Sequence, residues 1–197
     1  MVEAESWWRK CFLLLWASAA AIKLLVASQL PLFVDEAFYW QEGQHLAPAY
    51  SDLPGLTAWL TRLGVELGGQ HVLALRLPFL AIAAVIPWFV VRMSARWFGE
   101  VAGWQAGVLC LLMPLSGTLG LLAVPDVPMA LATVLCLHAV ARLLRQVNAF
   151  NAVELAFGLT LGALSHYRFL GVIGMGLIAL LLLPQGRRLL RDSRGWM

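Results

Sequence analysis

The chain has 197 residues, of which 61% are hydrophobic and 13% are charged, and its formal net charge is +3. Because soluble domains carry about a quarter charged residues, this composition excludes a soluble globular domain and predicts an integral membrane protein. The three cysteines lie within apolar stretches without CxxC spacing, so the sequence predicts neither a disulfide framework nor a zinc site.

Six apolar segments, separated by charged residues, follow one another along the chain. They comprise residues 11–30, 77–91, 101–124, 127–141, 152–165 and 169–184. A spanning helix needs about 20 residues, so the third segment fits directly, whereas the second, fourth and sixth need their flanking residues. The fifth segment is the weakest, because Glu154 lies near its start and His166 follows its end. These segments predict an all-α membrane bundle of about six transmembrane helices.

The first apolar segment leads into a long connection over residues 31–76. We expect the segment to remain as a signal anchor, because Glu3 and Glu5 precede it and Asp35 follows where a cleavage site would lie. Within the connection, apolar residues at positions 56, 59, 60 and 63 have the spacing of an amphipathic helix. Its tryptophan favours an interfacial helix on the bilayer, and a loop helix that caps the bundle fits the same pattern.

The placement of lysine and arginine predicts the orientation of the bundle. If the N-terminus is cytoplasmic, ten of the fourteen basic residues lie on the cytoplasmic side: Arg9, Lys10, Arg92, Arg96, Arg142, Arg145, Arg187, Arg188, Arg191 and Arg194. Only Arg62, Arg76 and Arg168 lie on the other side, and Lys23 lies within the first segment, where it would snorkel or neutralise an acid. Basic residues collect on the cytoplasmic side of membrane proteins, so we predict a cytoplasmic N-terminus.

Three polar sites then emerge on the non-cytoplasmic face: Asp35-Glu36, Asp126 and the cluster His166-Tyr167-Arg168. Ionisable groups at a membrane boundary are functional candidates, and three on one side can converge on one cavity. Simpler interpretations stay open at each position. The acidic pair can be part of a solvated loop, Asp126 a helix N-cap before Pro128, Arg76 an interfacial anchor, and His166 with Tyr167 an interfacial pair.

Five short strings carry a family resemblance. They are DEAFYW at 35–40, YSDLPGL at 50–56, LRLP at 75–78, PDVPM at 125–129 and SHYRFLG at 165–171. In this order, and with this topology, they resemble the polyprenyl-phosphate-dependent glycosyltransferases of the type-C membrane fold. The most similar groups are the bacterial relatives of dolichyl-phosphate-mannose–protein mannosyltransferases and the lipid A aminoarabinose transferases. Two strings depart from the family pattern: Asp52-Leu53-Pro54-Gly55 replaces a Lys or His before Pro-Pro, and His166 stands where Lys commonly precedes the Tyr.

The resemblance implies a transferase that moves a sugar from a polyprenyl-phosphate donor to an unidentified lipid, glycan or protein acceptor. Its active site would lie on the periplasmic face of the bacterial inner membrane. Asp35 is the implied catalytic base, while Glu36 and Asp126 would orient the acceptor or a divalent metal, a cofactor that the sequence leaves unknown. Arg forms bidentate bonds to phosphate, so the implied donor-binding residues are Arg76 and Arg168 together with His166 and Tyr167. The expected partners are the donor and the bilayer, and nucleic acid is not expected.

Two other functions stay open. A transporter or flippase component for a lipid-linked intermediate would explain the acids without catalysis, although the sequence shows no inverted repeat of the kind that would favour it. A non-catalytic fragment is the second alternative, because members of the family are usually much longer. On the same ground, we expect residues 1–197 to form a single transmembrane domain, a truncated N-terminal module of such an enzyme.

Overall fold

The computed structural model describes residues 2–191, and within them the chain forms ten α-helices and no β-strand. In chain order the helices are α1 (Val2–Gln29), α2 (Val34–Gly43), α3 (Leu56–Gly68), α4 (Val72–Phe98), α5 (Glu100–Leu112), α6 (Pro114–Thr118), α7 (Asp126–Leu143), α8 (Ala149–Ser165), α9 (Phe169–Leu182) and α10 (Pro184–Arg191). The all-helical architecture predicted from the apolar segments is therefore confirmed.

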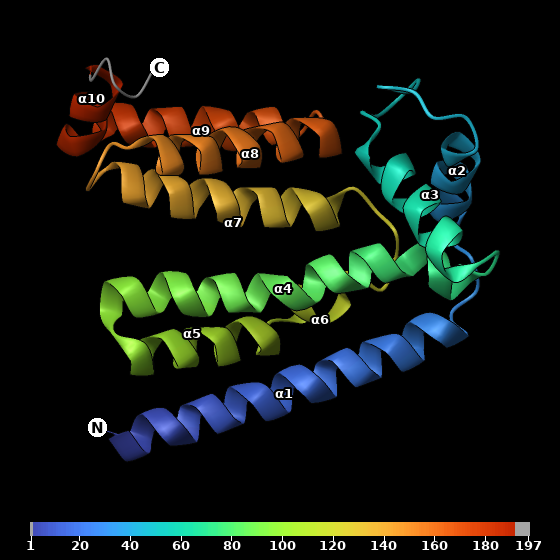
Figure 1. Cartoon of the computed structure of the whole chain (residues 1–197), viewed down its shortest axis with the longest axis horizontal. Helices are drawn as coiled ribbons and strands as arrows, with labels where there is room; N and C mark the ends of the chain where they lie inside the picture. Colours follow the sequence, from blue (N-terminus) through green and yellow to red (C-terminus); the bar gives the residue numbers. More distant parts are fainter. Residues whose placement is uncertain (1, 192–197) are drawn as a thin grey trace.

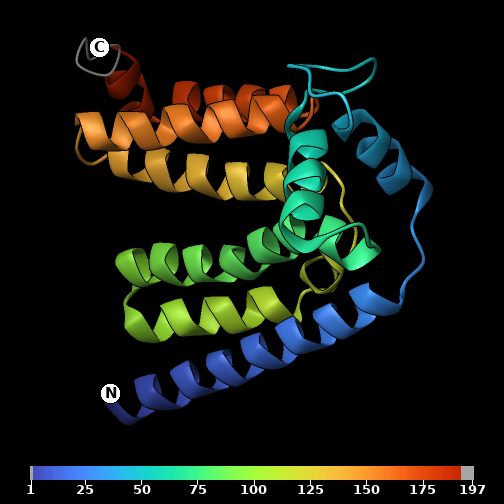
Figure 2. The same ribbon diagram turned by 45° about the vertical axis from the view of Figure 1, so that its right-hand side comes forward.

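Six of these helices run side by side and alternate in direction, as Figures 1 and 2 show for α1, α4, α5, α7, α8 and α9. Helix α4 lies in the middle and packs against α1, α3, α5 and α7, while α7 packs on α8 and α8 on α9. Helices α2 and α3 gather at one end of the bundle, and α10 lies at the opposite end (Figure 1). The connections that carry the predicted site thus meet at the α2–α3 end.

Length and composition identify fewer candidate membrane spans than the six predicted helices. Three helices are long and apolar enough to cross a membrane: Glu3–Gln29, Val72–Phe98 and Asp126–Leu143. Helices α9 and α10 together supply a fourth candidate, although they are bent by 104° at the break between them. Helices α5 and α8 are apolar but shorter. The chain is thus an integral membrane protein with three to four candidate spans.

The third apolar segment is not one continuous helix, which corrects the prediction for residues 101–124. Helix α5 ends at Leu112, and α6 starts anew at Pro114 after Met113 adopts an extended backbone with ψ 132°. Proline lacks an N–H group and disfavours helical geometry in the residue before it, so the break follows from Pro114. Lys23 covers this break, because its Nζ donates hydrogen bonds to the carbonyls of Ser116 at 2.6 Å and Leu119 at 2.9 Å. It therefore contacts backbone carbonyls rather than a bundle acid.

The predicted amphipathic helix is present as α3, but its buried face differs from its apolar stripe. The buried positions are small or β-branched: Thr57, Ala58, Thr61, Gly64 and Val65. A Cβ atom at position 64 would lie 2.3 Å from the carbonyl oxygen of Ala74, so glycine lets α3 approach α4 closely. The larger apolar residues of the stripe stay partly exposed, and Leu63 is 45% exposed.

Basic residues lie mainly at the end of the bundle opposite α2 and α3. The N-terminal part of α1, the C-terminal ends of α4 and α7, and α10 share this end (Figure 1). They carry nine of the ten residues predicted to be cytoplasmic, and Arg194 lies outside the described residues. The charge separation follows from the fold, while the orientation in a membrane stays a prediction.

Candidate active site

Helix α2 separates the two acids of the Asp35-Glu36 pair. Successive residues of an α-helix point about 100° apart, so two neighbours cannot share one environment at a helix surface. Asp35 is exposed, whereas Glu36 is fully buried with 0% exposure. Tyr39 and Gly43 follow Glu36 on the buried side, where α2 packs on α3. The two carboxylates therefore have different surroundings and different chemical roles.

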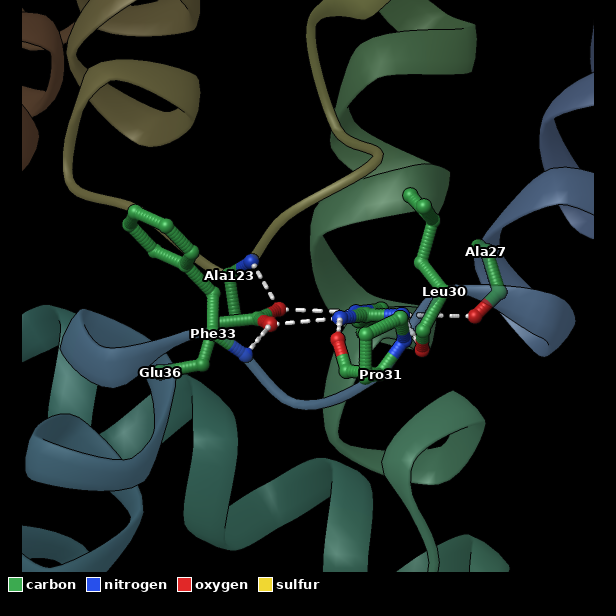
Figure 3. Close-up of polar contacts among 7 residues, drawn as sticks. Ala27, Leu30, Pro31, Phe33, Glu36 and Ala123 are labelled. Atoms are coloured by element: carbon green, nitrogen blue, oxygen red, sulfur yellow. Dashed lines mark hydrogen bonds and ion pairs between the residues drawn. The ribbon is translucent and has the colours of Figure 1, made fainter.

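Glu36 forms a buried ion pair with Arg76, which is also 0% exposed (Figure 3). Arg76 Nε donates to Glu36 Oε1 at 2.7 Å, and Arg76 Nη2 donates to Glu36 Oε2 at 2.5 Å. The carboxylate also accepts hydrogen bonds from the backbone N–H groups of Ala123 at 2.8 Å and Phe33 at 3.0 Å. Both oxygens of Glu36 thus accept two hydrogen bonds each.

The remaining N–H groups of Arg76 bind the end of α1. Nη1 donates to the carbonyls of Ala27 at 2.7 Å and Leu30 at 2.9 Å, and Nη2 donates to the carbonyl of Pro31 at 2.9 Å (Figure 3). A guanidinium has five N–H donors, so all of them are occupied. Arg76 was expected to bind the donor phosphate, but in this structure it holds α1, α2 and α4 together and has no donor left for a ligand.

The Glu36 carboxylate stays ionised in this network. Burial acts to raise the pKa of Glu36, but the hydrogen bonds from Arg76, Ala123 and Phe33 outweigh it and bring the pKa below its ordinary value. Breaking a buried ion pair by removing one partner costs about 3–5 kcal/mol, because the other charge is left uncompensated. The pair therefore fixes the position of α2, and with it the position of Asp35.

Four acids surround the phenol of Tyr39 at this end of the bundle. Burial, together with the negative charges of Asp35, Asp52, Glu42 and Asp126, raises the pKa of Tyr39 to about 12. Tyr39 lies four residues after Asp35 and three before Glu42, so α2 places all three on adjoining turns. Asp35 and Asp126, far apart in the sequence, thus act on the same phenol.

Asp52 reaches this group through a tight loop between α2 and α3. The N–H of Tyr50 donates to the carbonyl of Leu53 at 2.9 Å, which closes a turn around Asp52. The indole of Trp59 donates to the carbonyl of Ala47 at 2.8 Å and holds the loop on α3. Tyr39 and Asp52 had no role predicted from the sequence, although both lie within the strings that carry the resemblance. Helical spacing from Asp35 was the available signal for Tyr39.

Asp126 lies beside the cluster His166-Tyr167-Arg168. Arg168 Nη2 is 3.6 Å from Asp126 Oδ1, and both side chains are about half exposed, at 58% and 47%. Helix α7 begins at Asp126, and no side chain caps it, so the N-cap interpretation is not what the structure shows. The carboxylate still lies at a helix N-terminus, where negative charge is favourable.

His166 is the buried member of this cluster, at 6% exposure. Its ring nitrogens are each 3.0 Å from a nitrogen of Arg168, Nδ1 from the backbone N–H and Nε2 from Nε. Burial and the Arg168 charge lower the pKa of His166, against the opposing effect of Asp126 and Asp52. A neutral imidazole offers one acceptor nitrogen, so it accepts from one of these groups at a time. Tyr167 is 62% exposed and its ring lies 4.2 Å from the ring of His166.

This end of the bundle therefore contains an exposed carboxylate, Asp35, and an exposed cation, Arg168. Within residues 2–191, no three histidine, cysteine, aspartate or glutamate side chains are placed to hold a metal ion.

Comparisons with known proteins identify the family of the chain. A family model described as dolichyl-phosphate-mannose-protein mannosyltransferase matches residues 52–197. Lipid A galacturonosyltransferase RgtD of Rhizobium johnstonii (strain DSM 114642 / LMG 32736 / 3841) is 31% identical over 164 residues, which cover 81% of this chain and 34% of that protein. The chain thus spans about a third of the length of this curated relative. No solved structure matches the chain.

Proposed function

Since the chain belongs to the dolichyl-phosphate-mannose-protein mannosyltransferase family, we propose that it is the N-terminal transmembrane module of a glycosyltransferase. The donor in this proposal is a sugar linked to polyprenyl phosphate, and the acceptor is a hydroxyl of a lipid, glycan or protein. The observation that carries the proposal is the division of the acidic pair: Glu36 is held by Arg76, while Asp35 stays exposed.

Asp35 is the proposed general base. It accepts the proton of the acceptor hydroxyl while the hydroxyl oxygen bonds to the anomeric carbon of the sugar. The bond between that carbon and the phosphate oxygen breaks, and the phosphate leaves with the electron pair. A positioned base contributes about 10²–10⁴-fold to such a step. Glu36 has the supporting role of fixing α2, and Asp126 orients the acceptor from the start of α7.

Arg168 is the proposed contact for the donor phosphate. Its guanidinium is 58% exposed and its ion pair with Asp126 is long, at 3.6 Å, so a phosphate can compete for it. Arg76 is engaged in the buried network and serves as a positioning residue in this proposal. Tyr167 offers an exposed ring beside Arg168, and His166 holds the Arg168 side chain in place.

The membrane arrangement in this proposal extends what length alone indicates. The six side-by-side helices form one domain over residues 1–197, with α5 and α8 completed by their flanking connections. Helix α3 lies at the membrane interface, an assignment supported by its partly exposed apolar stripe. The basic end faces the cytoplasm and the α2–α3 end faces the periplasm, in a bacterial inner membrane.

A transfer assay tests the function. The first probes are polyprenyl-phosphate galacturonate as donor and lipid A as acceptor, because RgtD is named a lipid A galacturonosyltransferase. Asp35→Asn should abolish the mass increase of the acceptor in membranes that contain the protein. Glu66→Gln on α3 is the matched control, because Glu66 is an acid whose side chain is 56% exposed and pairs only with Arg62 among the described residues.

Arg168→Ala separates donor binding from base catalysis. The phosphate is bound before and during transfer, so loss of Arg168 should raise KM more than it lowers kcat. Wild-type rates in Asp35→Asn would show that Asp35 is a solvated surface acid without a catalytic role. Movement of the donor across the membrane without cleavage of its sugar–phosphate bond would instead establish a flippase component.

A further inference from the structure

A cavity lies at the basic end of the bundle, opposite the candidate active site. Its volume is about 480 Å³, within the roughly 300–1,000 Å³ of small-ligand sites. Helices α4 and α5 form it, with Arg92, Arg96 and Glu100 as its charged lining and the rings of Trp88 and Trp104 as its walls. The proposed transfer reaction uses none of these residues.

The charged groups of this cavity are largely free to meet a ligand. Within residues 2–191, the side chains of Arg92 and Glu100 form no ion pair or hydrogen bond, and both residues are exposed. Arg96 uses one N–H group on His138 Nε2, at 3.0 Å, which leaves other donors unused. The indole N–H of Trp104 is buried and has no acceptor among the described residues. The lining therefore offers several donors and a single carboxylate.

The aromatic walls of the cavity are fixed by packing. The rings of Trp88 and Trp104 lie 6.3 Å apart at an interplanar angle of 82°. Phe12 of α1 packs against both, at 5.0 Å from Trp88 and 5.5 Å from Trp104, and is itself fully buried. This rigid apolar surface continues from the charged mouth toward the middle of α4.

The position of the cavity on α4 indicates the depth of lipid head groups. Arg92 and Arg96 belong to the last two turns of α4, a helix long and apolar enough to span the membrane. Trp97 in the same stretch is stacked by Arg145, whose guanidinium carbon is 3.6 Å from the ring centroid. Tryptophan and arginine mark the membrane–water interface, and basic pockets between helices bind phospholipid head groups.

We propose that this cavity binds the head group of an ethanolamine phospholipid. The phosphate lies between Arg92 and Arg96, the ammonium pairs with the Glu100 carboxylate, and the glycerol and first acyl carbons contact the tryptophan walls. Two cationic side chains and one carboxylate complement a head group with one phosphate and one ammonium. A phosphatidylglycerol head group would leave Glu100 unpaired beside its phosphate, and the choline ammonium has no N–H to donate to Glu100.

Native mass spectrometry of the purified protein tests this assignment. The protein is mixed with equimolar phosphatidylethanolamine, phosphatidylglycerol and phosphatidylcholine of identical acyl chains. We expect the ethanolamine lipid to be retained preferentially. Arg92→Gln should weaken that retention about tenfold, the scale of one charge-assisted hydrogen bond. Glu100→Gln should keep lipid bound but abolish the preference for ethanolamine over glycerol head groups.

Arg9→Gln is the matched control, because it removes the same charge from an exposed arginine on α1, outside the cavity. Thermal unfolding of each variant verifies that it folds. Equal losses of phosphatidylethanolamine retention in Arg9→Gln and Arg92→Gln would show that the lipid is attracted generally to the basic end, and would overturn the proposal. An unchanged head-group ratio in Glu100→Gln, or a wild-type preference for phosphatidylglycerol, would overturn it as well.

Discussion

Replacing Glu36 by glutamine should destabilise the protein far more than replacing its neighbour Asp35 by asparagine. The glutamine keeps the shape of the side chain but removes the charge that compensates Arg76 in a fully buried position. Removal of one partner of a buried ion pair costs about 3–5 kcal/mol. One oxygen also becomes an NH₂ group, which faces the donors of Arg76 or of the backbone N–H groups of Ala123 and Phe33. Asp35 is exposed, so the free energy of unfolding of Asp35→Asn should stay within about 0.5 kcal/mol of that of the wild type.

Equilibrium unfolding in detergent micelles measures this difference. Trp40 packs against the core cluster formed by α3, α4 and the start of α7. The chain has nine tryptophans, and the contribution of Trp40 to their fluorescence changes when this region loosens. A loss of 3 kcal/mol changes the folding equilibrium by about two powers of ten, which moves the midpoint well beyond experimental error. The unchanged slope of the transition would show that the same structure unfolds in both variants.

Equal stabilities of Glu36→Gln and Asp35→Asn would refute this reasoning. That outcome would mean that Glu36 and Arg76 do not form the buried network in the membrane. Arg76 would then be free to bind the donor phosphate, as the family resemblance had implied.

Three further predictions concern the pH dependence of stability, the approach of α3 to α4, and the orientation in the membrane. Folding lowers the pKa of Glu36, so the ionised carboxylate stabilises the folded protein fully above the unfolded pKa of about 4.3. This stabilisation is lost as the pH falls through the lower pKa of the folded state. The free energies of unfolding of the wild type and of Glu36→Gln should therefore converge in acid. Gly64→Ala should lower the free energy of unfolding by about 1–3 kcal/mol in the same assay, because its Cβ would lie 2.3 Å from a backbone oxygen of α4. Gly117→Ala is the control and should leave stability unchanged, because no atom lies within 4 Å of its Cβ position. A cysteine at Ser51 should react with an impermeant thiol reagent from outside the cell, and one at Gln146 only after permeabilisation; the reverse would invert the predicted orientation.

Apolar runs separated by charged residues in the sequence predicted most of the fold. The segments at 77–91, 127–141, 152–165 and 169–184 correspond to α4, α7, α8 and α9, with boundaries that differ by a few residues. The extra turns of α4 contain charged residues at both ends, which a search for apolar runs leaves out. Helix α2 was not predicted, because it is short and rich in polar residues, and its N-cap is Phe33 rather than a typical capping residue.

The candidate site was predicted in its location but not in its contacts. Topology placed Asp35, Asp126 and Arg168 on one face, and the structure gathers them at the α2–α3 end. The engagement of Glu36 by Arg76 was not visible in the sequence, since 40 residues separate the two and both types also occur as ligand contacts. Only the packing of α4 against the end of α1 shows which acid of the pair is buried.

The Arg76 network has a consequence for how the chain is synthesised. Arg76 donates hydrogen bonds to one carbonyl in the last turn of α1 and to two just after it, yet it follows them by 45 to 49 residues. At translation rates of about 5–20 residues per second, the 40 residues between Glu36 and Arg76 take roughly 2–8 s to emerge. During that interval the carbonyls at the end of α1 and the Glu36 carboxylate are without their Arg76 hydrogen bonds. Insertion of α4 is then the event that draws the first loop into place, so Asp35 acquires its final position only after the second long span has been made.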